Sequence, residues 1–197
     1  MTRQRLRREV RHELILDAAT EVFGRIGFEA TRMQDVARAA GIAKGLLYKH
    51  FASKDALFEA LVERQGEAMA AELRTALQGA DVKADPFEAL RSGLRFWLGK
   101  VGEHETAFNV TDPGVHDAYD GLRDSLRAVI ADAVRTADPS VSEPHARLAA
   151  ALVQGAAENL GLAWRAQPGP IGDEEALTVL ATFCWGGLTA LQALALG

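Results

Sequence analysis

The sequence predicts an all-α fold. Apolar residues recur at intervals of three and four along most of the 197 residues, which is the spacing of one helical face. No segment shows the alternation of apolar and polar residues, with tight turns, that predicts strands and hairpins. Helix starts at Ser53 and Asp85-Pro86, and stops such as Gly41, divide the chain into about nine helices.

The first predicted helix carries a single apolar stripe and ends at Gly27-Phe28. Its apolar residues stand at offsets of three and four, so they share one face of the helix. We expect that face to pack against the two short helices that follow. The stripe consists of Ile15, Ala18, Ala19, Val22 and Phe23.

The segment from Thr31 to Lys54 predicts two short helices around a glycine turn. Thr31 followed by Gln34 has the spacing of a capping box, so the first of these helices begins there. Gly41 tolerates a positive φ and so lets a helix over residues 43–50 leave at a steep angle. The outward side of that helix carries hydrogen-bond donors and no carboxylate, which suits a groove walled by phosphates.

Longer helices follow. Ser53 is placed to cap a fourth helix that continues to about Leu77. A fifth begins at Asp85-Pro86, because proline suits a first helical turn. Between Gly99 and Gly114 the helical pattern weakens, and we expect a short helix and irregular chain. The last three helices are predicted over residues 115–136, 143–167 and 173–196.

Charge is divided unevenly along the chain, whose net charge is −5. Residues 1–54 contain 11 Lys or Arg and 6 Asp or Glu, a net +5, whereas residues 55–197 contain 11 and 21, a net −10. A basic end therefore precedes an acidic body, and only the basic end favours a polyanion such as DNA. We expect two domains, residues 1–54 and 55–197.

Export, membrane insertion and enzyme chemistry are all disfavoured. The sequence has no long uncharged apolar run and no signal-peptide core, and the single Cys184 indicates a reducing cytoplasm. His104-Glu105 and His116-Asp117 are adjacent pairs and lack the spacing of a helical zinc site. Since no nucleophile or phosphate-binding motif is present either, we expect no enzyme, no metal and no cofactor.

The spacing Gly-x-x-x-Gly-x-x-Tyr-x-x-Phe-x-x-Lys-x-x-Leu resembles the signature of the TetR family of bacterial transcriptional regulators. Its members here are Gly41, Gly45, Tyr48, Phe51, Lys54 and Leu57. The first helix and its exit turn extend the resemblance to almost all of the first 60 residues. Ala43 departs from the family pattern, which commonly has Ser or Thr as the cap of the recognition helix. The resemblance implies an N-terminal helix-turn-helix domain and a larger helical domain that binds ligand and dimerises.

A dimer of this kind would bind a near-palindromic operator, because its two recognition helices enter successive major grooves. Lys44 and Arg32 are the best candidates to read base edges, while Gly45 permits close approach and Leu46 is suited to a thymine methyl. Backbone phosphates are the expected partners of five further residues. These are Thr31, Tyr48, Lys49, His50 and Lys54.

The resemblance also implies a homodimer and a small-molecule effector that releases the protein from DNA. The last two helices are unusually apolar and contain glycines, whose cost in a helix is easier to explain if another helix backbone approaches closely. Candidate interface residues are Leu152, Gly155, Leu177, Leu180, Gly187, Leu188 and Leu191. Candidate pocket residues are Phe96, Trp97, Phe108, His116, Tyr119, Asn159 and Trp164.

Several alternatives stay open at this point. The lysines could be ordinary solvated side chains, Tyr48 could cap the small core, and the last two helices could form an intrachain core only. The arginines before residue 12 could form an arm in the minor groove or a solvated tail. Repression is the commoner behaviour of the family; activation, or action through a protein partner, is the alternative function.

Overall fold

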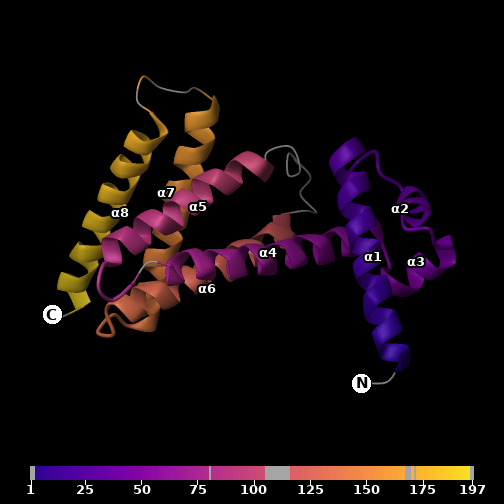
Figure 1. The fold of residues 1–197 in the computed structure, drawn as a ribbon, viewed down its shortest axis with the longest axis horizontal. Coiled ribbons are helices and arrows are strands. Elements are labelled where there is room, and N and C mark those ends of the chain that lie inside the picture. Colours follow the sequence, from indigo (N-terminus) through magenta and orange to yellow (C-terminus); the bar gives the residue numbers. More distant parts are fainter. Residues whose placement is uncertain (1–2, 80, 105–115, 167–169, 171, 196–197) are drawn as a thin grey trace. The chain divides into compact units, whose positions relative to one another are not determined.

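The computed structural model describes residues 3–79, 81–104, 116–166, 170 and 172–195, and within these residues every regular element is an α-helix. The helices are α1 (Arg3–Ile26), α2 (Met33–Ala39), α3 (Lys44–His50), α4 (Lys54–Gln78), α5 (Pro86–His104), α6 (His116–Ala137), α7 (Glu143–Ala166) and α8 (Asp173–Ala195) (Figure 1). The predicted fold class is therefore confirmed, with eight described helices against about nine expected.

One predicted boundary is wrong. Helix α5 continues to His104, so Gly99 and Gly102 lie inside it instead of opening an irregular segment. A helical glycine costs about 1 kcal/mol relative to alanine. Packing of the Leu94 face against α7 and α8 offsets that cost. Residues 105–114, where the extra short helix was expected, lie outside the described part of the chain.

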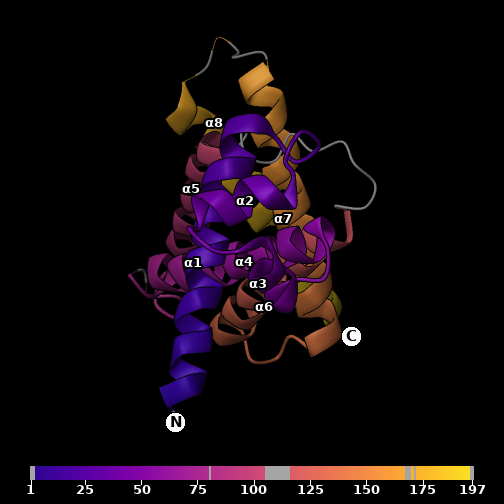
Figure 2. The ribbon, with the colours of Figure 1, turned by 90° about the vertical axis from the view of Figure 1, so that its right-hand side faces the viewer.

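The chain forms two compact units. The first contains α1, α2, α3, residues of α4 up to Gly66 and the start of α6 up to Leu122. Figures 1 and 2 show α2 and α3 beside α1 in both views. Its fully buried side chains come from all of these first four helices, so they share one small core. The largest are Phe58, Ile15, Leu16, Leu47, Leu57, Val22, Val36 and Val62.

The second unit contains the rest of α4 and α6 together with α5, α7 and α8. Leu94 of α5, Val153 of α7 and Leu177 of α8 belong to one cluster of buried residues. Cys184 lies in the same cluster, and burial raises the pKa of its thiol. The thiol therefore stays protonated and packs as a small apolar group.

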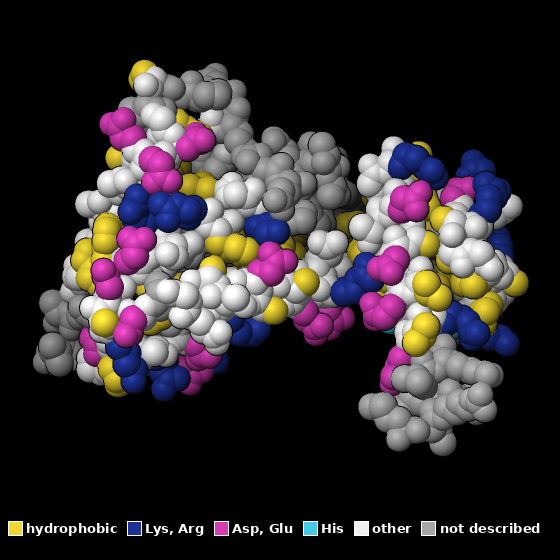
Figure 3. Space-filling view, viewed as in Figure 1, with side chains coloured by type: hydrophobic (Ala, Val, Ile, Leu, Met, Phe, Trp, Pro, Cys, Tyr) yellow, Lys and Arg dark blue, Asp and Glu magenta, His cyan; other side chains and the backbone are white. Residues whose placement is uncertain are grey.

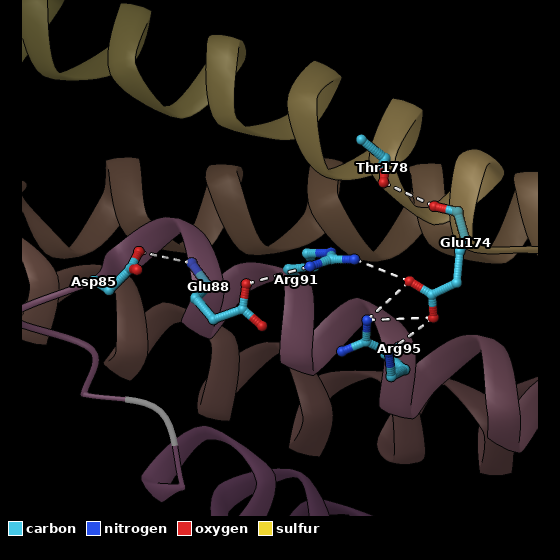
Figure 4. Close-up of polar contacts among 6 residues, drawn as sticks. All are labelled: Asp85, Glu88, Arg91, Arg95, Glu174 and Thr178. Carbon is cyan, nitrogen blue, oxygen red and sulfur yellow. Dashed lines mark hydrogen bonds and ion pairs between the residues drawn. The ribbon is translucent and has the colours of Figure 1, made fainter.

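An ion-pair cluster joins α5 to α8 at the surface (Figure 4). The Glu174 carboxylate accepts hydrogen bonds from Arg91 at 2.9 Å and from Arg95 at 3.1 Å. The hydrogen bond from Arg95 is the largest cause that lowers the pKa of Glu174. Because the Glu174 side chain is 69% exposed, the cluster contributes little to stability and mainly fixes the start of α8.

Candidate functional site

Helix α3 presents an exposed row of donors on a firmly anchored backbone. Leu47 is fully buried and Phe51 is 5% exposed, so the inner side of α3 is held in the core. Lys44, Gly45 and Lys49 are exposed on the other side, and the first turn contains no acidic residue. In Figure 3 the blue Lys and Arg side chains gather over α2 and α3. This surface is suited to contact a polyanion.

The base-reading candidates are accessible to different degrees. A Cβ added to Gly45 would meet no heavy atom within 4 Å, so the backbone there is open to a close approach. The Lys44 ammonium lies 5.8 Å from the centroid of the Tyr48 ring, and Tyr48 is 44% exposed. Leu46 is half-buried and offers only part of its side chain. As expected, Ala43 gives the start of α3 no side-chain cap.

The turn between α2 and α3 has the predicted geometry. Gly41 has a φ of +65°, in the left-handed region that favours glycine. The Ile42 amide donates to the Ala37 carbonyl at 3.0 Å, and the Gly41 amide donates to the Arg38 carbonyl at 3.2 Å. These two bonds close the end of α2. The angle at which α3 leaves α2 is therefore fixed by the backbone.

The start of α2 corrects one prediction. The N-cap is Arg32, and the carboxylate of Asp35 accepts a hydrogen bond from the Arg32 amide at 3.2 Å. The predicted capping box of Thr31 and Gln34 is thus wrong by one position. Thr31 is 3% exposed and its hydroxyl donates to the Gly27 carbonyl at 2.6 Å. That bond ties α2 to the exit turn of α1, whereas Arg32 remains exposed.

The Lys54 ammonium, expected to contact a phosphate, is engaged inside the protein. It donates to the carbonyls of Phe28 at 2.8 Å and Glu29 at 3.4 Å. It also lies 4.1 Å from the centroid of the Phe28 ring, a cation–π distance. Lys54 therefore joins the first residue of α4 to the turn that leaves α1.

Replacing Lys54 by Met should lower the free energy of unfolding by about 1 to 2 kcal/mol, because two hydrogen bonds and a cation–π contact are lost while the aliphatic chain remains. Urea denaturation of the whole chain measures this change. Lys49→Met is the matched control, since Lys49 is exposed, and its effect should stay within about 0.5 kcal/mol. Equal midpoints for the two variants would contradict this role of Lys54.

His50 stands in a basic environment at the end of α3. Burial lowers the pKa of His50, and the charges of His12, Arg8 and Arg11 lower it further. The ring centroids of His50 and His12 are 6.1 Å apart. At neutral pH His50 is therefore mainly uncharged, and it can offer a phosphate a hydrogen bond instead of a full charge.

Arg64 is a connecting residue that sequence reasoning missed. One nitrogen of its guanidinium bonds Asp17 at 2.7 Å and Glu13 at 3.2 Å, and the other bonds the Thr20 hydroxyl at 3.1 Å. These partners lie on α1, more than 40 residues away in the sequence. No short-range pattern marks such a contact. Arg64 and Lys54 together hold the first part of α4 against α1 and its exit turn.

A cavity of about 120 Å³ lies within the second unit. It is lined mainly by residues from the end of α4 and from α5, α6, α7 and α8, and almost all of these residues are apolar. The aromatic and polar residues of the lining are Trp97, Trp185 and Gln154. Such an apolar space with a few polar groups is the usual form of a small-molecule site.

Of the five predicted pocket residues whose side chains the structure describes, only Trp97 lines this cavity. Tyr119 packs edge-on against Phe58 in the first unit, and the Asn159 amide donates to the Gly155 carbonyl. The Trp164 indole donates to Asp173 at 3.0 Å, and the Phe96 ring lies 5.9 Å from the Lys100 ammonium. Phe108 and the side chain of His116 lie outside the described part. The actual lining is mostly aliphatic, and aliphatic residues look like core in a sequence.

Helices α7 and α8 each expose two large apolar side chains spaced four residues apart. Leu148 and Leu152 on α7 are 61% and 68% exposed, and Val179 and Phe183 on α8 are 57% and 76% exposed. We call these four residues the C-terminal apolar face. Large apolar side chains rarely gather on a free surface unless a partner covers them.

The predicted interface residues divide into three groups. Leu152 lies on the C-terminal apolar face, and Cβ atoms added to Gly155 or Gly187 would meet nothing within 4 Å. In contrast, Leu177 and Leu180 are 2% and 5% exposed and belong to the core of their own chain, so we remove them from the interface. Leu188 is half-buried against that core, and the side chain of Leu191 lies outside the described part.

Among the described residues, no three His, Cys, Asp or Glu side chains are grouped so that they could hold a metal ion. No helix in the same residues has both the length and the apolar character needed to cross a bilayer.

Comparison with known proteins agrees with the geometry of the first unit. Residues 15–61 match the family model described as "Bacterial regulatory proteins, tetR family". The chain is 26% identical to the HTH-type transcriptional activator FasR of Mycolicibacterium smegmatis, over 94% of this chain and 86% of that one. It is 37% identical to the HTH-type transcriptional regulator UidR of Escherichia coli, over 33% of each chain.

The fold of a solved structure extends this agreement to nearly the whole chain. A TetR-like transcriptional regulator from Rhodococcus sp. RHA1 is 29% identical, with a TM-score of 0.58, and the match covers 91% of this chain and 96% of that one. Together with the glycine turn and the exposed donors of α3, these matches show that residues 15–61 resemble the helix-turn-helix domain of TetR-family regulators and that the fold of the chain is similar to that of a TetR-like regulator.

Proposed function

We propose that the chain binds a near-palindromic DNA operator as a homodimer and that a small-molecule effector releases it. The observation that carries the proposal is the α3 surface, whose exposed Lys44, Gly45 and Lys49 stand on a buried backbone anchor. Lys44 and Arg32 read base edges, with Gly45 and Leu46 against the bases. Tyr48, Lys49 and His50 contact phosphates. Thr31 and Lys54 act by shaping the α1 exit turn.

A second copy of the chain covers the C-terminal apolar face. This dimer contact uses Leu148, Leu152, Val179 and Phe183, and the glycines at 155 and 187 allow helices to approach closely. The dimer places two α3 helices on successive major grooves. Residues 1–54 form the DNA-binding domain and residues 55–197 the ligand-binding and dimerisation domain, and the protein works in the cytoplasm.

The effector acts through α4, because this helix contributes residues to both compact units. A ligand in the cavity touches Leu73 and Leu77 near the end of α4. Lys54 and Arg64 pass any displacement of α4 to α1. The ligand shifts the equilibrium between DNA-binding and released states only by its difference in affinity for the two.

Activation is the second candidate for the sign of regulation. It is favoured by one observation, that the relative matched over 94% of this chain is named a transcriptional activator. Repression and activation both require the same binding to DNA. Transcription from a promoter carrying the operator, with and without the protein, distinguishes them.

DNA binding itself is tested by titrating random duplex DNA at several salt concentrations. We expect affinity to fall steeply as salt rises, because each phosphate contact releases a counterion. Absence of salt-sensitive binding would refute the proposal and favour action through a protein partner.

A further inference from the structure

Two buried polar atoms on the cavity-lining residues have no hydrogen-bond partner among the described residues. They are the indole nitrogen Nε1 of Trp97 and the amide oxygen Oε1 of Gln154. Gln154 is 3% exposed. A buried polar group without a partner has lost its hydrogen bonds to water and gained none in return, which is unfavourable. Native proteins therefore seldom keep two of them around one cavity unless something else binds there.

The orientation of the Gln154 amide is fixed by its neighbours. Its Nε2 donates to Oε1 of Glu158 at 3.0 Å, and the same carboxylate oxygen accepts from Arg123 at 3.4 Å. A carboxylate paired with an arginine can only accept, so the Gln154 NH₂ group must face Glu158. The other end of the amide is then an acceptor. Trp97 Nε1, in contrast, can only donate.

The remainder of the lining excludes charge. Among the described residues that enclose the cavity there is no Lys, Arg, His, Asp or Glu. A carboxylate or ammonium group inside it would lose its hydration without gaining an ion pair, which is costly. The ligand that fits is therefore neutral.

The size of the cavity bounds the part of the ligand that enters. At about 120 Å³ it is slightly smaller than an apolar cavity of about 150 Å³ that holds benzene. Leu77, Val82 and Ala133 also line an open groove beside Arg74 and Lys83. The part of the ligand that enters the cavity is therefore at most about the size of a benzene ring, and the groove adjoins the cavity at these three residues.

We propose that the cavity binds a small neutral molecule whose apolar body carries a hydroxyl or amide group, and that this group accepts from Trp97 and donates to Gln154. The proposal rests on the proposed function only in taking this cavity as the effector site. It adds the chemical class of the effector. The protein offers that effector one donor, Trp97, one acceptor, Gln154, and no charged group.

The test compares phenol, toluene and benzoate, titrated by NMR into the whole protein. Phenol should bind, and benzoate should bind at least about tenfold more weakly. Trp97→Phe and Gln154→Met should each raise the Kd of phenol about 3- to 10-fold, because each removes one hydrogen bond. The Kd of toluene, which makes neither bond, should change less than about twofold.

Trp185→Phe is the matched control, because Trp185 lines the same cavity while its indole nitrogen is not one of the two unpaired atoms. It should change phenol and toluene binding by the same factor. The class is wrong if Trp97→Phe and Gln154→Met affect phenol and toluene alike, as they would if water alone met these two atoms. The proposed ligand class is also wrong if benzoate binds the unmodified protein more tightly than phenol does, and this comparison needs no variant.

Binding to duplex DNA is measured on the same samples. If DNA binding is intact but none of the three probes binds, the ligand class is refuted while the proposed function stands. If salt-sensitive DNA binding is absent, the proposed function fails, and the phenol and toluene comparison still decides the chemistry of the cavity.

Discussion

Replacing Phe183 by Glu should convert the dimer to a monomer and weaken operator binding by at least about a hundredfold, since the two recognition helices would no longer bind as one unit. Phe183 is 76% exposed in the single chain, so the substitution should leave the fold of the protomer intact. In the proposed dimer the same position is covered, and a buried unpaired carboxylate is strongly unfavourable. Sedimentation velocity at micromolar protein measures the change of state.

Ala128→Glu is the control for this substitution. Ala128 is exposed on α6, so the variant introduces the same charge on a different face of the second unit. It should remain dimeric and bind the operator normally. A Phe183→Glu protein that still sediments as a dimer would show that the C-terminal apolar face is not the interface.

Replacing Lys44 by Ala should cost about 1 to 3 kcal/mol at the operator and relax the preference for one base pair, because a lysine that reads a guanine edge discriminates by about that amount. Binding to random DNA should change much less. Titrations of the variant with the operator and with single-base-pair variants of it measure both effects. Because the Lys44 side chain is exposed, replacing it by alanine should leave the fold intact.

Lys49→Ala is the matched control on the same short helix. It should weaken binding to all sequences nearly equally and reduce the salt dependence by about one counterion. If both variants lost the same amount on operator and on random DNA, the division of α3 into reading and anchoring residues would be refuted.

The DNA-binding end could be predicted from sequence because its signals are local. The glycine turn at Gly41 and the Ser53 cap, whose hydroxyl oxygen accepts from the Ala56 amide at 3.0 Å, depend on residues a few positions apart. Even here the pattern was incomplete. Thr31 matches a capping box in sequence, but its hydroxyl forms a tertiary bond to Gly27, and Asp35 makes the capping contact instead.

Long-range contacts account for what the sequence could not reveal. Lys54 looks like a free lysine at a helix start, yet its partners are carbonyls 25 and 26 residues away. The cavity was missed for a related reason, since Leu73, Ala89 and Val153 have the same helical spacing whether they fill a core or surround a space. Apolar residues of the same helix, α8, also differ in how far they are exposed. Leu180 lies inside the protomer and Phe183 outside, and no apolar pattern distinguishes them.

Selection of bound fragments from random duplex DNA tests the central claim most directly, namely that a dimer reads DNA with α3. The account predicts a two-fold symmetric sequence whose half-sites are centred about 34 to 36 Å apart, one helical turn of DNA. The Lys44→Ala protein should recover the same symmetry with one position relaxed in each half-site. A recovered pool without a shared sequence, or with a single unrepeated motif, would contradict it.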